Sequence, residues 1–301
     1  MSARVIEGKA IAATLRQALE ARIERLEKKG LVPGLAVVLV GEDPASISYV
    51  TGKGHACEEL GMHSEEHRLP ESVTETELLA LVGRLNADPA IHGILVQLPL
   101  PAHINSENII EAISPFKDVD GIHPESLGKI MLGRPTFIPC TPHGVVKMLV
   151  ASGVQIAGAH VVIVGRSTIV GKPLANLLIQ RGAEANATVT LCHTGTRNLG
   201  HFTRMADILI AAAGRPGLIR ADMVKAGAVV IDVGVTRVAD ASRKRGFRLV
   251  GDVAYDEVSE VASAITPVPG GVGPMTITML MHNTVEAAER AAARGDGGAS
   301  P

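Results

Sequence analysis

Aromatic residues and cysteines are scarce in this chain of 301 residues, and their scarcity excludes several kinds of protein. It has no Trp, two Tyr and four Phe, so the stacking platforms that bind single-stranded nucleic acid are largely unavailable. Cys57, Cys140 and Cys192 are far apart and form no CxxC pair, which predicts neither a disulfide framework nor a zinc site. We therefore expect no metal, and we expect a reducing, cytoplasmic compartment.

Blocks of like charge and long apolar runs are also missing. The 29 basic and 31 acidic residues give a net charge of -2 without forming a block, which argues against a nucleic-acid partner. No apolar run approaches the roughly 20 residues that a membrane-spanning helix needs. The first residues carry Arg4 and Glu7 where a signal peptide would be apolar, so the sequence predicts neither a membrane segment nor a leader.

The first half of the chain alternates between helix and strand patterns. Apolar residues recur at helical spacing from Gly8 to Lys29, and the continuous apolar runs 34–41 and 93–98 predict strands buried on both faces. We expect further helices over 46–60 and 75–85, with one short strand between them over 65–69. The stretch 99–142 is rich in Pro, Gly, Asn and Asp, which predicts loops and one short helix over 107–113.

The second half predicts a doubly wound sheet. Four buried runs, each followed by a turn or a helical stretch, lie at 159–164, 188–192, 208–211 and 229–232. A last helix is expected from Met275 to about Ala293. The predicted fold class is α/β, with an N-terminal α/β catalytic domain and a Rossmann-type nucleotide-binding domain. We expect the first domain to comprise residues 1–140 and 275–293, the second 141–274, and 294–301 to form a disordered tail.

A glycine-containing turn, residues 165–173, joins the first of these strands to its helix. Backbone N–H groups and the helix dipole make such a turn an anion site, although Ser167 replaces the second Gly of the usual GxGxxG pattern. No acid follows the next strand to bind a ribose hydroxyl, whereas Arg166 and Thr194 could bind a 2′-phosphate. The pattern favours NADP over NAD; a tight structural turn with a solvated Arg166 is the alternative.

Tyr49 and Lys53 are four residues apart in a predicted helix, so their side chains share one face. A helical Lys is usually a solvated cation, and the spacing alone is weak support for a site. Gln97 is a polar residue in an otherwise buried strand, near the strand end where α/β sheets bind ligands. It could serve such a site, or it could bond a loop carbonyl in the core.

Two loops add candidates to this group. Asp120 precedes Gly121, and its carboxylate could bind an amino-heterocycle or could be ordinary turn chemistry. The segment 267–274 reads Pro-Val-Pro-Gly-Gly-Val-Gly-Pro, and so many conformationally special residues in one loop suggest a backbone shaped against a ligand.

Several blocks resemble the bifunctional methylenetetrahydrofolate dehydrogenase/methenyltetrahydrofolate cyclohydrolase family. The similar blocks fall in order along nearly the whole chain, at residues 46–53, 93–101, 117–121, 139–142, 165–171, 231–234, 251–253 and 265–275. The resemblance implies an enzyme of one-carbon metabolism that oxidises methylenetetrahydrofolate with NADP and then hydrolyses the methenyl product. It also implies a homodimer and a last helix that folds back onto the N-terminal domain.

The resemblance assigns roles to the candidate residues. Lys53 would be catalytic, Tyr49 and Gln97 would position and tune it, and Asp120 would anchor the pterin. For the cofactor it implies Gly165, Arg166, Ser167, Thr194 and Val235, and we add Pro267 and Gly271 to the folate site.

The chain departs from the family pattern at His55, where a second basic residue is common, and at Gly52 and Gly54, which flank Lys53. Thr194 and Gly195 stand where many members have Ser and Lys. These departures leave the cyclohydrolase rate and the strictness for NADP open. The alternatives are a dehydrogenase without the hydrolase step and a silent NADP- or folate-binding regulator.

Overall fold

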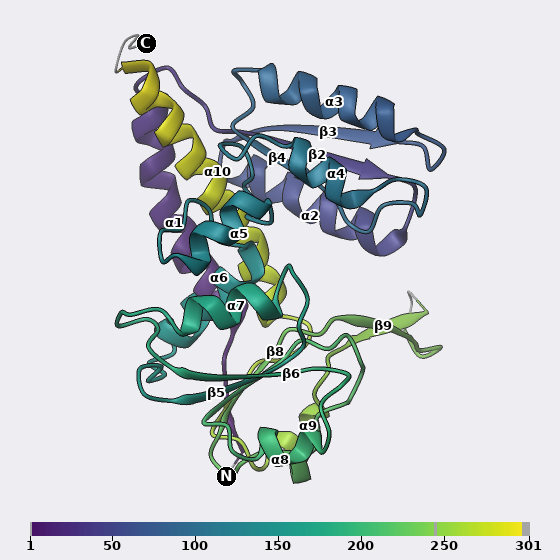
Figure 1. Ribbon diagram of the computed structural model, residues 1–301, viewed down its shortest axis with the longest axis vertical. Coiled ribbons are helices and arrows are strands. Elements are labelled where there is room, and N and C mark those ends of the chain that lie inside the picture. The colour runs from purple at the N-terminus through teal and green to yellow at the C-terminus, as the bar shows by residue number, and fades with distance from the viewer. Residues whose placement is uncertain (1, 244–245, 297–301) are drawn as a thin grey trace. The chain divides into compact units, whose positions relative to one another are not determined.

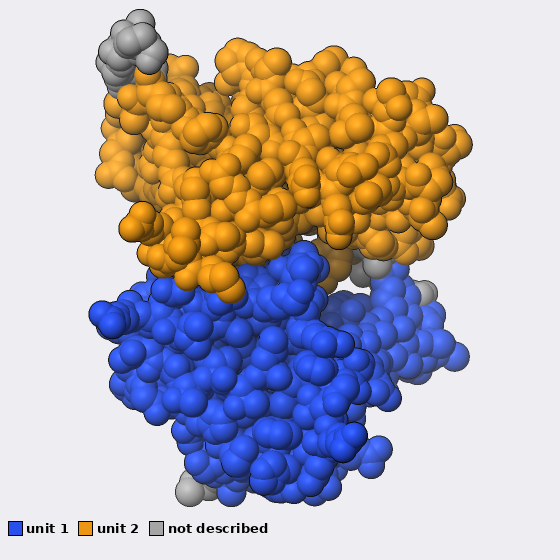
Figure 2. Space-filling view, in the orientation of Figure 1, with its two compact units in different colours: residues 1–13, 141–276 blue, residues 14–140, 277–301 orange. Residues whose placement is uncertain are grey.

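The structure is a computed structural model that describes residues 2–243 and 246–296 (Figure 1). Its internal contacts divide the chain into two compact units, coloured separately in Figure 2. Unit 1 comprises residues 1–13 and 141–276, and unit 2 comprises residues 14–140 and 277–301. No helix within the described residues is long and apolar enough to cross a membrane.

Unit 2 is built on a parallel three-stranded sheet in the order β3 (His63–Leu69), β2 (Gly34–Val40) and β4 (Gly93–Val96). Every residue of the central strand β2 is buried, and alternate side chains face two different clusters. Leu35, Val37 and Leu39 join a cluster with α2 (Pro44–Glu59), whereas Ala36, Val38 and Val40 join one with α3 (Glu75–Ala87). The continuous apolar run therefore reflects a strand covered on both faces, as predicted.

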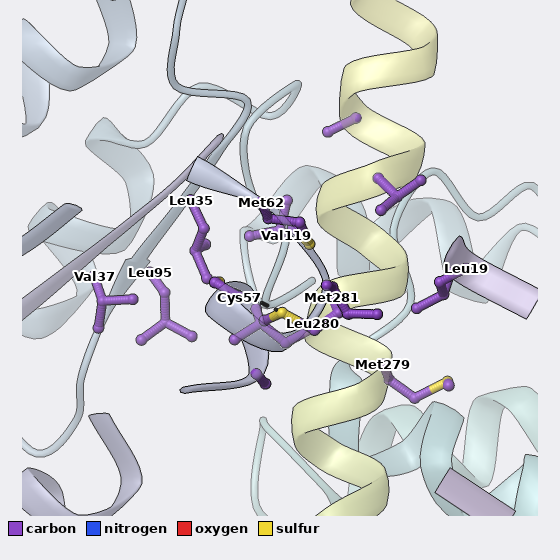
Figure 3. Close-up of a cluster of buried hydrophobic side chains, with 14 of the residues drawn as sticks. Leu19, Leu35, Val37, Cys57, Met62, Leu95, Val119, Met279, Leu280 and Met281 are labelled. Atoms are coloured by element: carbon purple, nitrogen blue, oxygen red, sulfur yellow. Dashed lines mark hydrogen bonds between the residues drawn. The ribbon is translucent and has the colours of Figure 1, made fainter. Parts of the chain in front are cut away.

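The last helix, α10 (Val272–Asp296), lies beside α1 (Gly8–Glu27) and supplies part of the core of unit 2 (Figure 1). Met281 lies in the same buried cluster as Cys57 of α2, whose thiol is 3.5 Å from the Met281 sulfur (Figure 3). The Arg22 guanidinium donates two bonds to the Glu289 carboxylate, at 3.0 and 2.6 Å. The prediction that the last helix packs on the N-terminal domain is confirmed.

The last helix extends three residues into the range 294–301 that was predicted to be a disordered tail. Residues 294–296 belong to α10, and the Arg294 guanidinium lies 4.4 Å from the centre of the Phe116 ring, a cation–π contact. This contact gives the last turn of the helix a partner that composition does not reveal. Residues 297–301 lie outside the described residues.

The stretch 99–142 is more helical than predicted. It contains α4 (Ser106–Ala112), α5 (Pro124–Met131) and the start of α6 (Cys140–Ala151). Only α4 was expected. The prolines of this stretch indicate loops, but Pro is well suited to the first turn of a helix, where Pro124 lies. The His123 ring accepts the Glu125 N–H at 3.0 Å and caps this helix.

Unit 1 holds a parallel six-stranded sheet in the order β1-β11-β8-β7-β5-β6, which confirms the doubly wound prediction. Its strands are β1 (Arg4–Val5), β11 (Ala264–Ile265), β8 (Val229–Asp232), β7 (Ile208–Ala211), β5 (His160–Val164) and β6 (Thr188–Cys192). The other elements are α7 (Gly171–Leu178), α8 (Leu199–Thr203), η1 (Ala221–Met223), α9 (Tyr255–Val258) and the hairpin of β9 (Thr236–Ala239) and β10 (Phe247–Val250).

The units differ from the expected domain boundaries at the start of the chain. Residues 1–13 belong to unit 1 because β1 pairs with β11, with Arg4 opposite Ala264 and Val5 opposite Ile265. A strand of two residues is too short to produce a readable alternation. The assignment of one function to each range stays a prediction.

Gly54 makes a direct stability test possible. A Cβ added at this α2 position would have no atom within 4 Å, whereas one at Gly52 would lie 3.4 Å from the Ile277 Cδ1 atom. We expect Gly54→Ala to raise the free energy of unfolding by about 0.5–1 kcal/mol, because Ala loses less backbone entropy in a helix. Thermal denaturation of both alanine variants tests this, with a smaller gain expected at Gly52. A lower melting temperature for Gly54→Ala would contradict it.

Candidate active site

Lys53 is buried on α2, with 7% of its surface exposed, and its ammonium group donates to the Gln97 side-chain oxygen at 2.8 Å. Gln97 follows β4 directly, one residue beyond the strand, although the sequence predicted it inside the strand. Its amide group donates to the Leu98 carbonyl at 2.8 Å. The bond to a loop carbonyl that was considered for this glutamine is therefore present, and the same side chain accepts a hydrogen bond from Lys53; its part in a ligand site stays a prediction.

Asp120 lies close enough to Lys53 for the two charges to interact. Burial lowers the pKa of Lys53, and electrostatic interaction with Asp120 and then with Cys140 partly opposes that effect. Burial raises the pKa of Asp120. The Lys53 charge and a hydrogen bond with the Cys140 thiol lower it and partly offset this effect. A lysine held in this way can gain and lose a proton nearer neutral pH than a solvated one.

The loop that carries Asp120 is fixed by the neighbouring Asp118, which is almost fully buried. The Asp118 carboxylate accepts the Ile122 and His123 N–H groups at 3.2 and 3.0 Å and the Ser126 hydroxyl at 2.6 Å. Burial raises its pKa to about 6, an effect that these bonds oppose. Because three groups of the following turn converge on one side chain, the loop has little freedom.

Gly121 adds a second constraint on the same loop. Its φ of +72° favours glycine, and a Cβ there would lie 2.6 Å from the Pro139 nitrogen. The segments around residues 120 and 139 are thus in direct backbone contact. The Asp-Gly pair therefore forms a turn, which was one of the two interpretations of the sequence. It also places a carboxylate beside Lys53.

Tyr49 lies on α2 one turn before Lys53, with 37% of its surface exposed. The shared helix face predicted from the spacing is therefore present. His55 is exposed, and its ring nitrogen lies 3.4 Å from the Glu58 carboxylate. Because His55 lies on the solvent side of the helix, away from the buried side that holds Lys53, the departure at this position does not alter the lysine's contacts.

The turn 165–171 begins where β5 ends. Gly165 has a φ of +139°, and a Cβ there would lie 2.1 Å from the Ala212 carbonyl oxygen. A Cβ at Gly171 would lie 2.0 Å from the Gly165 carbonyl oxygen. Both glycines are required for close backbone approach, and Ser167 accepts the Val170 and Gly171 N–H groups at 3.1 and 3.4 Å.

The predicted cofactor residues all lie at the carboxyl edge of the six-stranded sheet, because its strands are parallel. Arg166 and Thr194, which follow β5 and β6, are exposed, and so is Val235, which follows β8. This edge is where open α/β sheets bind nucleotides. Among the described residues, no group of three His, Cys, Asp or Glu side chains is placed to hold a metal ion.

Pro267 and Gly271 follow β11 at the same edge. The Gly271 N–H donates to the Pro267 carbonyl at 2.9 Å, so the two residues close one turn. A Cβ at Gly8, where α1 begins, would lie 1.8 Å from the Gly271 carbonyl oxygen. Close backbone packing is thus one reason for glycine in this loop. The contact of Pro267 and Gly271 with folate stays a prediction.

Comparison with known proteins agrees with this arrangement. Residues 6–120 match the catalytic domain of the tetrahydrofolate dehydrogenase/cyclohydrolase family, and residues 139–292 match its NAD(P)-binding domain. The chain belongs to this family.

Relatives of the tetrahydrofolate dehydrogenase/cyclohydrolase family cover nearly the whole chain. Bifunctional protein FolD 2 of Geobacter metallireducens is 59% identical over 95% of this chain and 97% of its own length. The crystal structure of bifunctional FolD from Campylobacter jejuni is 48% identical, with a TM-score of 0.90 over 96% of this chain and 99% of that one. The Trypanosoma brucei FolD structure, complexed with NADP cofactor and an inhibitor, is 42% identical, with a TM-score of 0.92 over 97% and 99%.

In this member of the tetrahydrofolate dehydrogenase/cyclohydrolase family, two buried residues beside the Asp120 loop were not predicted from the sequence. Cys140 is buried, and its thiol donates to the Val119 carbonyl at 3.3 Å. Asn283 of α10 is buried, and its amide donates to the Val119 and Ile138 carbonyls at 2.8 and 2.9 Å. One amide therefore ties together the two segments that meet at Asp120.

We expect Asn283→Ala to raise the KM for the folate substrate about tenfold and to leave the KM for NADP unchanged. The substitution leaves the Ile138 carbonyl without its Asn283 donor and the Val119 carbonyl with only the Cys140 thiol, which costs about 1–3 kcal/mol and loosens the Asp120 loop. Steady-state kinetics with each substrate varied separately tests the split. Asn108→Ala, which removes an exposed bond to Glu75, is the control. Equal losses for both substrates would indicate general destabilisation.

Proposed function

We propose that this chain oxidises 5,10-methylenetetrahydrofolate to 5,10-methenyltetrahydrofolate with NADP, and then hydrolyses the methenyl product to 10-formyltetrahydrofolate. The observation that carries this proposal is the buried Lys53 ammonium, hydrogen-bonded to Gln97 and electrostatically coupled to Asp120. The family membership supplies both activities, and the buried lysine supplies a group suited to the hydrolytic one.

Hydrolysis requires that water be activated and that protons be moved. We assign this work to Lys53, because burial lowers its pKa and a cationic methenyl substrate would lower it further. Gln97 holds the lysine Nζ atom in place, and Tyr49 lies on the same helix to orient it. In this proposal Asp120 accepts hydrogen bonds from the pterin ring.

Oxidation depends on orientation more than on acid–base chemistry. When bound, NADP accepts a hydride from the methylene carbon, and the two adjacent folate nitrogens stabilise the resulting cation. The turn 165–171 fits this cofactor, because the Gly165 and Gly171 backbones are packed too closely for a side chain, and α7 begins at Gly171 at the sheet edge. We assign Arg166, Ser167 and Thr194 to its phosphates, and Gly165 and Val235 to backbone contacts.

The deciding experiment incubates the purified protein with methylenetetrahydrofolate and either NADP or NAD. We expect the reduced cofactor to form with NADP in preference to NAD, and 10-formyltetrahydrofolate to appear with only transient methenyl absorbance. Stable methenyl absorbance would indicate a dehydrogenase without the hydrolase step. No turnover with either cofactor would contradict the proposal.

We also propose that the protein acts as a homodimer in the cytoplasm. The homodimer follows from the family resemblance. The proposed cytoplasmic location is supported by the three buried cysteines, which are all free thiols, as is usual in a reducing compartment. Sedimentation of the purified protein tests the dimer: a species with the mass of one chain at working concentration would contradict it.

A further inference from the structure

Two buried carboxylates, Asp232 and Asp252, hold the loops at the carboxyl edge of the unit 1 sheet together. Asp232 ends β8, and its carboxylate accepts the Gly234, Asp252 and Val253 N–H groups at 3.0, 2.9 and 2.9 Å. Burial raises the pKa of Asp232 to about 6, so at neutral pH it is ionised and acts only as an acceptor. One carboxylate therefore connects the loop after β8 to the segment after β10.

Asp252 extends the connection to a third loop. One of its carboxylate oxygens accepts the Ala213 and Gly214 N–H groups, just after β7, at 2.6 and 2.8 Å. The segment after β10 is also hydrogen-bonded to residues 217–219, because the Gly217 N–H donates to the Gly251 carbonyl at 3.1 Å. The three loops at this edge are thus fixed by two side chains from within the protein.

The loops after β7 and β8 both lie next to predicted cofactor contacts. Ala212 directly precedes the two N–H groups that Asp252 holds, and its carbonyl oxygen is the atom that excludes a Cβ at Gly165. On the other side, Gly234 precedes Val235. Fixing residues 212–214 therefore fixes the backbone that Gly165 packs against, and fixing residues 233–235 fixes the predicted cofactor contact at Val235.

The two carboxylates leave no room for side chains on the facing backbone. A Cβ at Gly234 would lie 2.3 Å from the Asp252 Oδ1 atom, and a Cβ at Gly251 would lie 1.8 Å from the Asp232 Oδ2 atom. Asp252 Oδ1 is buried, and no hydrogen-bond partner for it exists among the described residues. An acceptor left unsatisfied costs stability, which indicates that the carboxylate is kept for the position it imposes.

We propose that Asp232 and Asp252 are positioning residues for NADP, which hold the loops 212–214 and 233–235 in the shape that receives the cofactor. This inference rests on the proposed function. It concerns only the dehydrogenase half of the activity, because hydrolysis of the methenyl substrate uses no NADP. The two activities of one protein therefore separate a positioning effect from a loss of folding.

The test compares Asp252→Ala and Asp252→Asn with the unchanged protein, by calorimetric titration with NADP and by separate assays of both activities. We expect Asp252→Ala to weaken NADP binding and raise its KM about tenfold or more, because the freed loop must be ordered on binding. Methenyl hydrolysis should stay within about twofold. Asp252→Asn keeps an oxygen for the Ala213 and Gly214 N–H groups and should restore most of the affinity.

Asp207→Ala is the matched control. Its carboxylate accepts the His160 N–H at 2.8 Å at the opposite, amino edge of the same sheet, so its loss should leave NADP affinity unchanged. If Asp252→Ala does not fold, Gly234→Ala displaces the same carboxylate from the other side and should give the same split. Unchanged NADP affinity in the folded variants would overturn the inference. An unchanged protein that fails to bind NADP would instead contradict the proposed function.

Discussion

Lys53→Met should lower the rate of methenyltetrahydrofolate hydrolysis by about 10²–10⁴-fold, the usual contribution of a positioned acid–base group. Methionine fills the buried space of the lysine stem but carries no proton, and it leaves the Gln97 oxygen without its 2.8 Å donor. Oxidation of methylenetetrahydrofolate should be reduced much less, since hydride transfer needs no side-chain base. A coupled assay should therefore show reduced NADP and persistent methenyl absorbance together.

Two further variants separate charge from proton transfer. Lys53→Arg keeps a positive charge near Asp120 but holds its proton at any working pH, so it should also lose hydrolysis. Lys28→Met, at an exposed position of the chain, should change neither rate. Hydrolysis at the normal rate in Lys53→Met would remove Lys53 from the mechanism.

Arg166→Ala should reduce the preference for NADP over NAD about 10- to 100-fold. Hydrogen bonds to charged groups contribute about 1.5–3 kcal/mol, and the guanidinium is the fork-shaped donor that suits a 2′-phosphate. Since NAD lacks this phosphate, its kcat/KM should change little. The measurement is the ratio of kcat/KM values for the two cofactors in the same preparation.

Arg181→Ala provides the comparison for this experiment. Arg181 is also exposed, but it follows α7 at the end of the helix remote from the turn 165–171. Its loss should leave the ratio intact. If Arg166→Ala left the ratio intact as well, Arg166 would be a solvated loop residue and the NADP preference would need another origin.

Local patterns predicted the parts of the fold that repeat over many residues. The buried run of β2 could be read directly, because a strand covered on both faces must be apolar throughout. The hairpin of β9 and β10 and the two-residue strands β1 and β11 were missed. The pairing of β1 and β11 joins distant residues, such as Arg4 and Ala264, and no local pattern records that. The hairpin strands β9 and β10 pair locally, but each has only four residues, which is too short for a clear alternation.

The candidate site shows the same limit. Lys53 and Gln97 could be nominated because each is unusual in its surroundings, a lysine beside a scarce tyrosine and an amide in an apolar run. Asn283 gave no such signal. It is an ordinary polar residue in a helix, and its partners Val119 and Ile138 are 164 and 145 residues away. Only the packing of α10 onto unit 2 reveals its contacts.

The discontinuity of unit 2 has a consequence for how the protein is made. Its main cluster takes Leu280, Met281 and Val285 from α10, although most of the unit is complete by residue 140. A ribosome releases the chain from its N-terminus, so the sheet of β2, β3 and β4 emerges long before the helix that covers it. During that interval the apolar surface around Cys57 lacks its cover, whereas unit 1 has all its strands once residue 265 has emerged. The unit that carries Lys53 is therefore finished last during synthesis.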